Sequence, residues 1–341
     1  ANSPQHPCGN AGDFRIGTPQ HFAAKCHRWC DIIDPCRHRH TLALGTHPVA
    51  VGRFDGFHWR ASISLHHISR TGDNPVSKLE ANDISVTFGD NKVLENVSFS
   101  VERGSFVGLV GANGSGKSSL LRSVLGIIKS PTGNVVIDGQ PTSEMTPRQI
   151  ASKVAYAPQG AEMHWMLPVE RLVGIGRTPH LAPWSKPTQA DMDVVEHALE
   201  VTDMIGLRHR IATTLSGGEK ARALLARAIA VGAPYLLADE PVAALDPYHQ
   251  LQVLDILAEM AQQDHGIVIV LHDLSLAQRY CDRIFLLHDG DVLAKGTPDE
   301  VFTDQRLDQA YGVRMARTEH NGTSFLTLID RSDRTVLPGS S

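Results

Sequence analysis

The chain has 341 residues, of which 42% are hydrophobic and 20% charged, and its formal net charge is −5. These values are ordinary for a globular protein with a packed core. The chain has no basic excess with which to bind nucleic acid phosphates, so we expect no nucleic acid partner. No apolar run approaches the roughly 20 residues that a membrane-spanning helix needs, so the chain is not expected to form a pore alone.

Residues 1–75 differ in composition from the rest of the chain. They hold nine of the 18 histidines and four of the five cysteines. They show no sustained helical or alternating pattern, so we expect an unstructured or non-native extension. Zinc binding is the alternative, because Cys and His are the usual ligands of structural zinc, although no C-x-x-C pair is present. The candidate ligands are Cys26, Cys30, Cys36, His38 and His40.

Ordered elements are predicted from Leu79 onward. Two alternating strands are expected at 79–88 and 93–101, joined by a turn, and they indicate an antiparallel β subdomain. A short buried strand at 105–110 precedes a helix at 117–128. Further buried strands at 235–238 and 266–271 are each followed by a helical stretch. This alternation predicts an α/β fold with a mostly parallel sheet and helices on both of its faces.

The remaining segments complete the predicted domain organisation. Residues 162–215 carry helical patterns and no convincing strand, which predicts a helical subdomain. We place the main domain at 76–310 and a C-terminal extension at 311–341.

A glycine-rich motif joins the strand at 105–110 to the following helix. It matches G-x-x-x-x-G-K-[ST], and its glycines allow backbone N–H groups to point at phosphate oxygens. Lys117 can reach the β- and γ-phosphates of a nucleotide, and the Ser118 hydroxyl can bind Mg²⁺. A glycine-rich turn without a ligand would not explain Lys and Ser at these positions. The predicted phosphate cradle comprises Gly111, Ala112, Asn113, Gly114, Ser115, Gly116, Lys117, Ser118 and Ser119.

Two acids follow the buried strand at 235–238. Charged groups are costly to bury, and the carboxyl ends of parallel strands are where ligands bind. Asp239 is therefore predicted to hold Mg²⁺, and Glu240 to orient and polarise an attacking water. A pair of exposed acids at the start of a loop is the alternative.

A second anion-binding pattern, LSGGE, occupies residues 215–219 and precedes a predicted helix. A serine and two glycines at a helix start present a hydroxyl and backbone N–H groups, as an ordinary N-cap also does. The functional positions are Ser216, Gly217, Gly218 and Glu219.

LSGGE resembles the signature motif of ABC ATPases, and residues 79 to about 300 resemble that family throughout. The segment YAPQ, ending at Gln159, resembles the Q-loop, in which the glutamine touches Mg²⁺ and the permease-facing surface. AALD, ending at Asp246, resembles the D-loop, and LHD around His272 resembles the switch-histidine segment. Phe88 stands where the family places an aromatic ring against adenine. Glu219 replaces a commoner Gln, and Ala243 a usual Ser or Thr.

This resemblance implies a P-loop ATPase that uses ATP and Mg²⁺ and powers a transporter. In the family, the signature motif of one subunit closes over ATP held by the cradle of another, so two copies would form a head-to-tail dimer with two composite sites. Integral membrane permease subunits are the implied partners, and a substrate-binding protein an indirect one. The implied location is peripheral, at the cytoplasmic face of the cell membrane.

Two stretches suggest the cargo. RLVGIGRTPH at 171–180 and LDPYHQ at 245–250 resemble importers of iron chelates, haem and cobalamin. Manganese, zinc and phosphonate importers share much of this pattern and remain the alternative. A soluble ABC protein of translation or DNA repair would usually carry two nucleotide domains or a long coiled coil, and a nucleotide-dependent kinase would lack LSGGE.

The resemblance also bears on where the working protein begins. Related proteins usually start a few residues before their first strand, and a valine codon can initiate translation in bacteria. We therefore expect a chain that starts at Val76 to fold and hydrolyse ATP as well as the full chain, which thermal melting and ATPase assays can compare. Zinc bound only to the long form would contradict this expectation.

Overall fold

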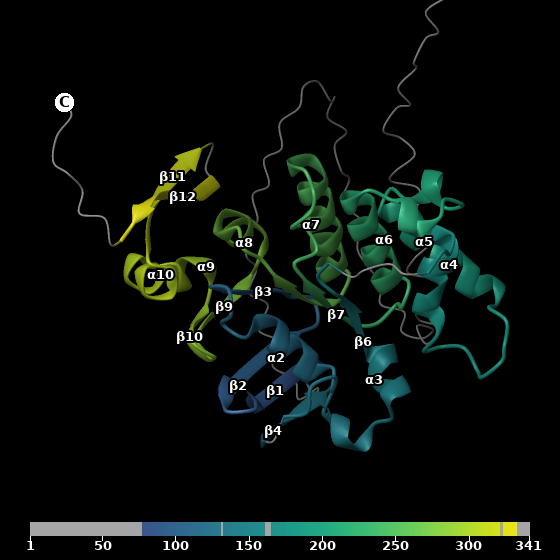
Figure 1. Ribbon diagram of the computed structural model, residues 1–341, viewed down its shortest axis with the longest axis horizontal. Coiled ribbons are helices and arrows are strands. Elements are labelled where there is room, and N and C mark those ends of the chain that lie inside the picture. The colour runs from purple at the N-terminus through teal and green to yellow at the C-terminus, as the bar shows by residue number, and fades with distance from the viewer. Residues whose placement is uncertain (1–76, 131, 161–164, 321–322, 333–341) are drawn as a thin grey trace, which may run out of the picture. The chain divides into compact units, whose positions relative to one another are not determined.

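The computed structural model describes residues 77–130, 132–160, 165–320 and 323–332 (Figure 1). The predicted extension at 1–75, its candidate zinc ligands and the predicted start at Val76 lie outside these residues.

A six-stranded sheet forms the centre of the described part. Its strands, in spatial order, are β10 (Asp291–Gly296), β9 (Arg283–His288), β3 (Phe106–Gly111), β8 (Gly266–Val270), β7 (Tyr235–Asp239) and β6 (Val154–Ala157). All neighbouring strands are parallel except β10, which runs antiparallel to β9. The predicted mostly parallel sheet is confirmed.

Successive side chains of the central strands enter two different hydrophobic clusters. In β8, Ile267 and Ile269 join the cluster on one face, whereas Val268 and Val270 join the cluster on the other. Strand residues alternate between faces, so a continuously apolar strand is what a sheet buried on both sides requires.

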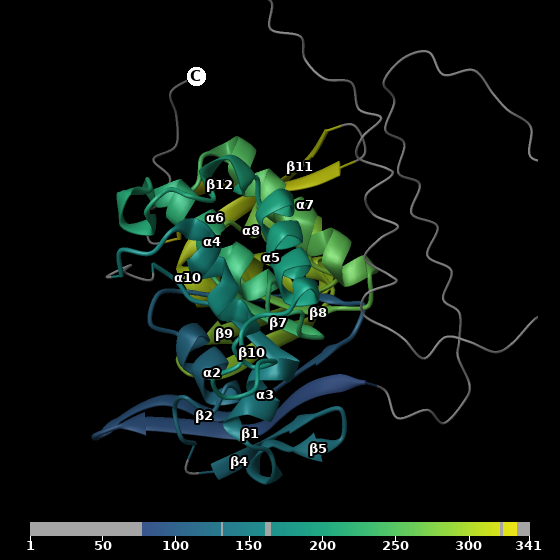
Figure 2. The same cartoon turned by 90° about the vertical axis from the view of Figure 1, so that its right-hand side faces the viewer.

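The antiparallel subdomain lies over one face of the six-stranded sheet, with a helix packed between the two sheets. Its strands are β2 (Asn91–Glu102), β1 (Lys78–Phe88), β4 (Thr132–Ile137) and β5 (Gln140–Pro141), in that spatial order. Helix α2 (Lys117–Val124) lies between this sheet and the six-stranded sheet (Figure 2). The helix ends four residues earlier than predicted, and Gly126 follows in a left-handed conformation that stops helices.

The other face carries most of the other helices. They are α4 (Val169–Gly174), α5 (Gln189–Val201), α6 (Gly217–Ile229), α7 (Pro247–Gln262) and α8 (Leu274–Tyr280), while α3 (Pro147–Lys153) precedes β6. Short 3₁₀ turns are η3 (Thr142–Glu144), η4 (Ile175–Arg177), η5 (Ile205–Leu207) and η6 (Ala212–Thr214). Helices α4, α5 and α6 pack on one another. The class of fold, with its helical subdomain, is confirmed, while the limits at 76, 162, 215 and 310 stay predictions.

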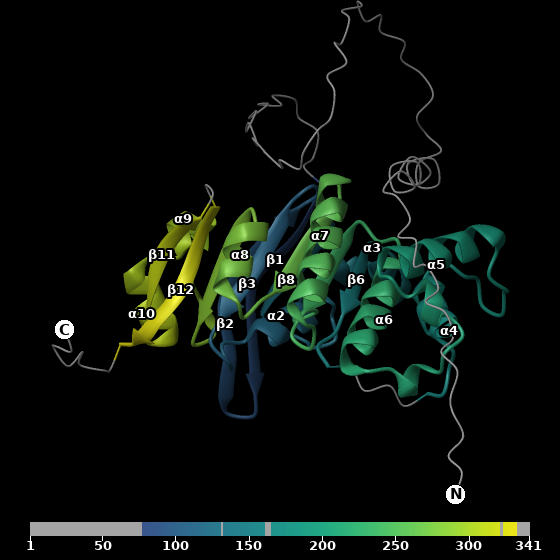
Figure 3. The same ribbon diagram turned by 90° about the horizontal axis from the view of Figure 1, so that it is seen from above.

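The chain continues after β10 with α9 (Pro298–Val301), α10 (Asp304–Tyr311) and a hairpin of β11 (Val313–His320) and β12 (Thr323–Arg331). The hairpin packs against α8, at the opposite end of the described part from α4 and α5 (Figures 1 and 3). None of the helices in the described ranges has the length and apolar character that crossing a membrane requires.

Candidate functional site

The loop between β3 and α2 curls tightly because three of its glycines adopt positive φ. Gly111, Gly114 and Gly116 have φ of 153°, 82° and 97°. A Cβ on Gly116 would lie 2.5 Å from Leu94 Cδ2 and 2.9 Å from the Val93 carbonyl oxygen. No larger residue fits there without a shift, so the sequence of this loop follows from its shape.

Two polar side chains of this loop are buried. The Lys117 ammonium donates to the carbonyl oxygens of Gly111 and Ala112, at 2.8 Å each, and burial lowers the pKa of this lysine. The Ser115 hydroxyl oxygen is buried and has no hydrogen-bond partner among the residues that the structure describes. Buried polar atoms are seldom left unpaired, so this one, in a glycine-rich loop before a helix, fits a phosphate-binding loop.

Asp239, the last residue of β7, is fully buried. Its two carboxylate oxygens accept hydrogen bonds from the hydroxyls of Ser118 and Tyr156, each at 3.1 Å. A buried carboxylate beside a hydroxyl of the phosphate loop provides oxygen ligands of the kind that Mg²⁺ takes. The residues therefore fit the predicted magnesium site.

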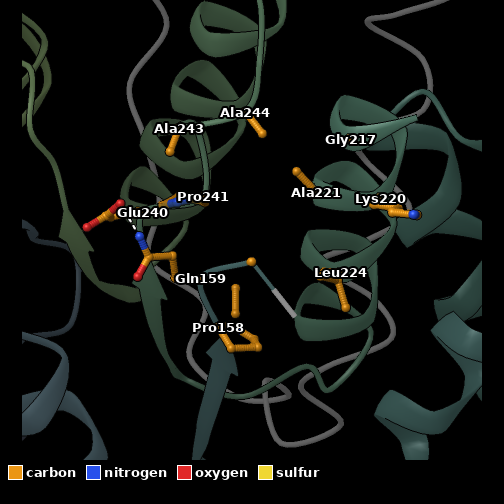
Figure 4. A pocket seen from close by; sticks show the side chains of 12 residues that line it. Pro158, Gln159, Gly217, Lys220, Ala221, Leu224, Glu240, Pro241, Ala243 and Ala244 are labelled. Carbon is orange, nitrogen blue, oxygen red and sulfur yellow. Dashed lines mark hydrogen bonds between the residues drawn. The ribbon is translucent and has the colours of Figure 1, made fainter. Parts of the chain in front are cut away.

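Glu240 is held from two sides. Gln159 Nε2 donates to Oε2 (Figure 4), and His272 Nε2 lies 2.5 Å from Oε1. The three residues follow β6, β7 and β8, which are neighbouring parallel strands, so their side chains meet at one sheet edge. Glu240 also has a positive φ of 51°, which is unusual for a residue with a side chain.

The LSGGE residues lie at the start of α6. Ser216 is its N-cap and forms a capping box with Glu219. A cavity of about 410 Å³ separates Gly217, Lys220 and Ala221 of α6 from Glu240 and Ala244 (Figure 4). In the described part of the chain, no hydrogen bond joins Ser216 or Glu219 to the cradle.

The last two predicted positions lie at element ends. The Asp246 side chain is the N-cap of α7, accepting from the backbone N–H of His249. Phe88, at the end of β1, is 54% exposed.

Two residues that contact the site were not predicted from the sequence. Tyr156 was only part of a motif, yet its hydroxyl binds Asp239; its place one residue before the end of a strand beside β7 could have indicated this contact. Arg210 binds Glu219, and no motif pointed to it.

These features together define a P-loop nucleotide-binding protein of α/β fold. Comparison with known proteins shows which family of P-loop proteins this chain belongs to. A family model described as "ABC transporter" matches residues 94–243.

Named relatives agree with this match. A hemin import ATP-binding protein of Streptomyces coelicolor is 39% identical over 251 residues, covering 73% of this chain and 88% of the relative. A petrobactin import ATP-binding protein of Bacillus anthracis is 36% identical over 230 residues, covering 67% and 84%. A cobalamin import ATP-binding protein of Halobacterium salinarum is 36% identical over 258 residues, covering 75% of this chain but only 64% of the relative's length.

Solved structures show the same fold. The structure of an ATP-binding subunit of an ABC transporter is 27% identical, with a TM-score of 0.60, and covers 68% of this chain and 94% of that one. An inward-facing transporter assigned to the metal-chelate type is 25% identical, with a TM-score of 0.65, and covers 74% and 97%. The chain belongs to the ATP-binding proteins of ABC transporters, and the predicted resemblance to the iron-chelate, haem and cobalamin group is confirmed.

Proposed function

We propose that this chain is the ATP-binding and ATP-hydrolysing subunit of an ABC importer, and that it energises uptake of an iron chelate, haem or cobalamin through a separate permease. The observation that carries the proposal is the bonding of Glu240 to both Gln159 and His272, beside Asp239 and the phosphate cradle. The names of the relatives support the class of cargo.

The cradle binds the phosphates of ATP. Its backbone N–H groups and the unpaired Ser115 hydroxyl accommodate phosphate oxygens, and Lys117 exchanges its two carbonyl partners for them. Phe88, exposed at the end of β1, offers its ring to the adenine. Mg²⁺, held through Ser118, Asp239 and Gln159, supplies positive charge against the phosphates when it is bound.

Glu240 is the residue assigned to the reacting water. Its carboxylate accepts a proton or orients the water, and His272 on the neighbouring strand end holds the carboxylate in place. Gln159 binds the other oxygen, so the segment that follows β6 is in direct contact with the proposed catalytic group.

The active form is a head-to-tail pair of this chain. One chain carries one cradle and one Ser216–Glu219 turn, and this turn has no bond to its own cradle. Ser216, Gly217 and Gly218 at the start of α6 suit an anion, since a helix N-terminus favours negative charge. Asp246, in the adjacent loop, completes the contact with the second copy.

The permease binds a groove beside the helical subdomain. A cavity of about 460 Å³ is lined mainly by apolar side chains, among them Ile127 after α2, Ile150 of α3 and Val231 just after α6. Arg227 also lines it, and burial lowers the pKa of this arginine. No ion pair joins Arg227 to an acid within the described residues, so the groove suits an apolar permease segment with one carboxylate. We therefore infer a peripheral location at the cytoplasmic face of the membrane.

The proposal is tested by transport in cells that lack the gene. Cells complemented with the natural chain should take up labelled iron chelate, haem or cobalamin, whereas cells with Glu240→Gln should not. The purified variant should bind ATP yet lose steady hydrolysis, because the side chain keeps its shape but not its basicity. Normal turnover of the variant would refute the role of Glu240. Loss of manganese, zinc or phosphonate uptake instead would correct the cargo.

A further inference from the structure

Arg210 connects two elements of the helical subdomain. Its carbonyl oxygen accepts from the backbone N–H of Val169, at the start of α4, at 3.0 Å. Its guanidinium reaches forward along the chain. Nη2 donates to the Thr214 carbonyl at 2.9 Å, and Nη1 lies 3.3 Å from Glu219 Oε1. Arg210 therefore braces the loop that leads into α6.

Both oxygens of the Glu219 carboxylate are occupied. Oε1 faces Arg210, and Oε2 accepts from the Ser216 backbone N–H at 2.7 Å. The hydrogen bond from Ser216 and the charge of Arg210 both lower the pKa of Glu219, so this side chain is negatively charged near neutral pH. The side chain is 21% exposed, which limits how far water can screen its charge.

A negative charge at this point favours the helix but opposes the proposed ligand. Glutamate in the first turn stabilises the positive end of a helix and closes a capping box. The same helix end, in the proposed function, must receive the terminal phosphate of an ATP held by the second copy. Like charges a few ångströms apart repel, so an uncompensated Glu219 would weaken that contact.

We propose that Arg210 is a positioning residue of the composite ATP site: it neutralises Glu219 and fixes the Ser216–Glu219 turn so that the turn can meet a phosphate. This inference rests on the proposed function. It assigns to Arg210 a task that a neutral residue at position 219 would make unnecessary.

The test is a double-mutant cycle in the full chain. Arg210→Ala should lower ATP hydrolysis about tenfold, through weaker closure of the pair, without changing ATP affinity of the separate chain. Glu219→Gln removes the charge that Arg210 neutralises, while glutamine can still close a capping box. The double variant should recover most of the lost activity. Arg210→Lys, which keeps the charge without the fork, should be intermediate.

Two measurements distinguish neutralisation of the Glu219 charge by Arg210 from a purely structural role of Arg210 in the loop. In the Glu240→Gln background, Arg210→Ala should weaken ATP-dependent dimerisation, and Glu219→Gln should restore it. Melting temperatures of all variants report any loss of folding. A double variant as impaired as Arg210→Ala would overturn the inference, as would unchanged hydrolysis in Arg210→Ala. Absence of hydrolysis by the natural chain would instead overturn the proposed function.

Discussion

Single residues of the phosphate loop differ in how strictly their surroundings require glycine. Gly114 and Gly116 both have positive φ, so a side chain at either position is strained by the backbone. A Cβ on Gly114 would meet nothing within 4 Å, whereas one on Gly116 would collide with Leu94 and with the Val93 carbonyl. The two positions thus separate backbone strain from steric collision.

We expect Gly116→Ala to lower the melting temperature more than Gly114→Ala, both measured without nucleotide. The strain at Gly114 costs on the order of 1 kcal/mol, and the collision at Gly116 adds to the same strain. Equal melting temperatures for the two variants would contradict the close contact between the loop and β2.

Residues that belong to a contiguous motif could be located from the sequence. Asp239 was placed at the end of a buried strand, and the structure has it as the last residue of β7. The partners of these residues were harder to find. Tyr156 contacts Asp239, 83 positions away, and Arg210 contacts Glu219, nine positions away. These contacts depend on where the side chains point in the fold, which sequence spacing alone does not show.

At the scale of the elements, the turn after β4 connects three other segments of the fold through one carboxylate. Asp138 follows β4, and its carboxylate accepts from Arg103 at 3.0 Å, Lys153 at 2.9 Å and the Tyr235 hydroxyl at 2.6 Å. These partners lie after β2, at the end of α3 and at the start of β7. Burial alone would raise the pKa of Asp138, but the bonds from Lys153 and Tyr235 and the charge of Arg103 outweigh it and lower the pKa.

Asp138→Asn should therefore destabilise the protein most at neutral pH. A carboxyl whose pKa is lowered by folding stabilises the folded state above its unfolded pKa of about 4, and this contribution is lost as the pH falls through the folded value. The variant should lose about 1–3 kcal/mol at pH 7 and progressively less below about pH 4. Denaturant unfolding at several pH values measures this, and a pH-independent difference would contradict it.

A buried side chain of β12 anchors the C-terminal hairpin. Leu326 is 5% exposed and belongs to the cluster that includes α8, while Leu328 in the same strand is 62% exposed. Leu326→Ala should cost about 2–4 kcal/mol and Leu328→Ala less than about 0.5 kcal/mol. Thermal unfolding compares them. Because α8 begins two residues after His272, faster amide exchange in α8 should accompany only the first change.

The arrangement of the strands and helices could be predicted from the sequence more accurately than the residues at which they end. Apolar runs of strand length separated by helical stretches predicted the parallel sheet, since only a doubly covered sheet buries such runs. The end of α2 was wrong by four residues. Apolar periodicity continues through Leu125, Ile127 and Ile128, but Gly126 turns the backbone away from the helix.

At the scale of the whole molecule, the proposed site is complete only in a pair. We predict that a Lys117→Ala chain and a Ser216→Arg chain, each inactive alone, regain ATP hydrolysis when mixed. The mixed pair joins the intact cradle of one chain to the intact α6 start of the other. A Lys117→Ala chain mixed with a chain that carries both Lys117→Ala and Ser216→Arg should stay inactive, because neither chain then has an intact cradle. Activity of either single variant alone would argue against the head-to-tail pair.

The order of strands has a consequence for how such a molecule can change over time. Gln159, Glu240 and His272 follow three adjacent strands, although 113 positions separate the first from the last. Helices α4 and α5 follow β6 in the chain and end before α6, whose start carries the Ser216–Glu219 turn, so they form a module between two anchor points. Insertions or deletions in that module can reshape the surface offered to a partner while the row of three side chains keeps its spacing. Partner choice and chemistry can therefore evolve as separate traits of one polypeptide.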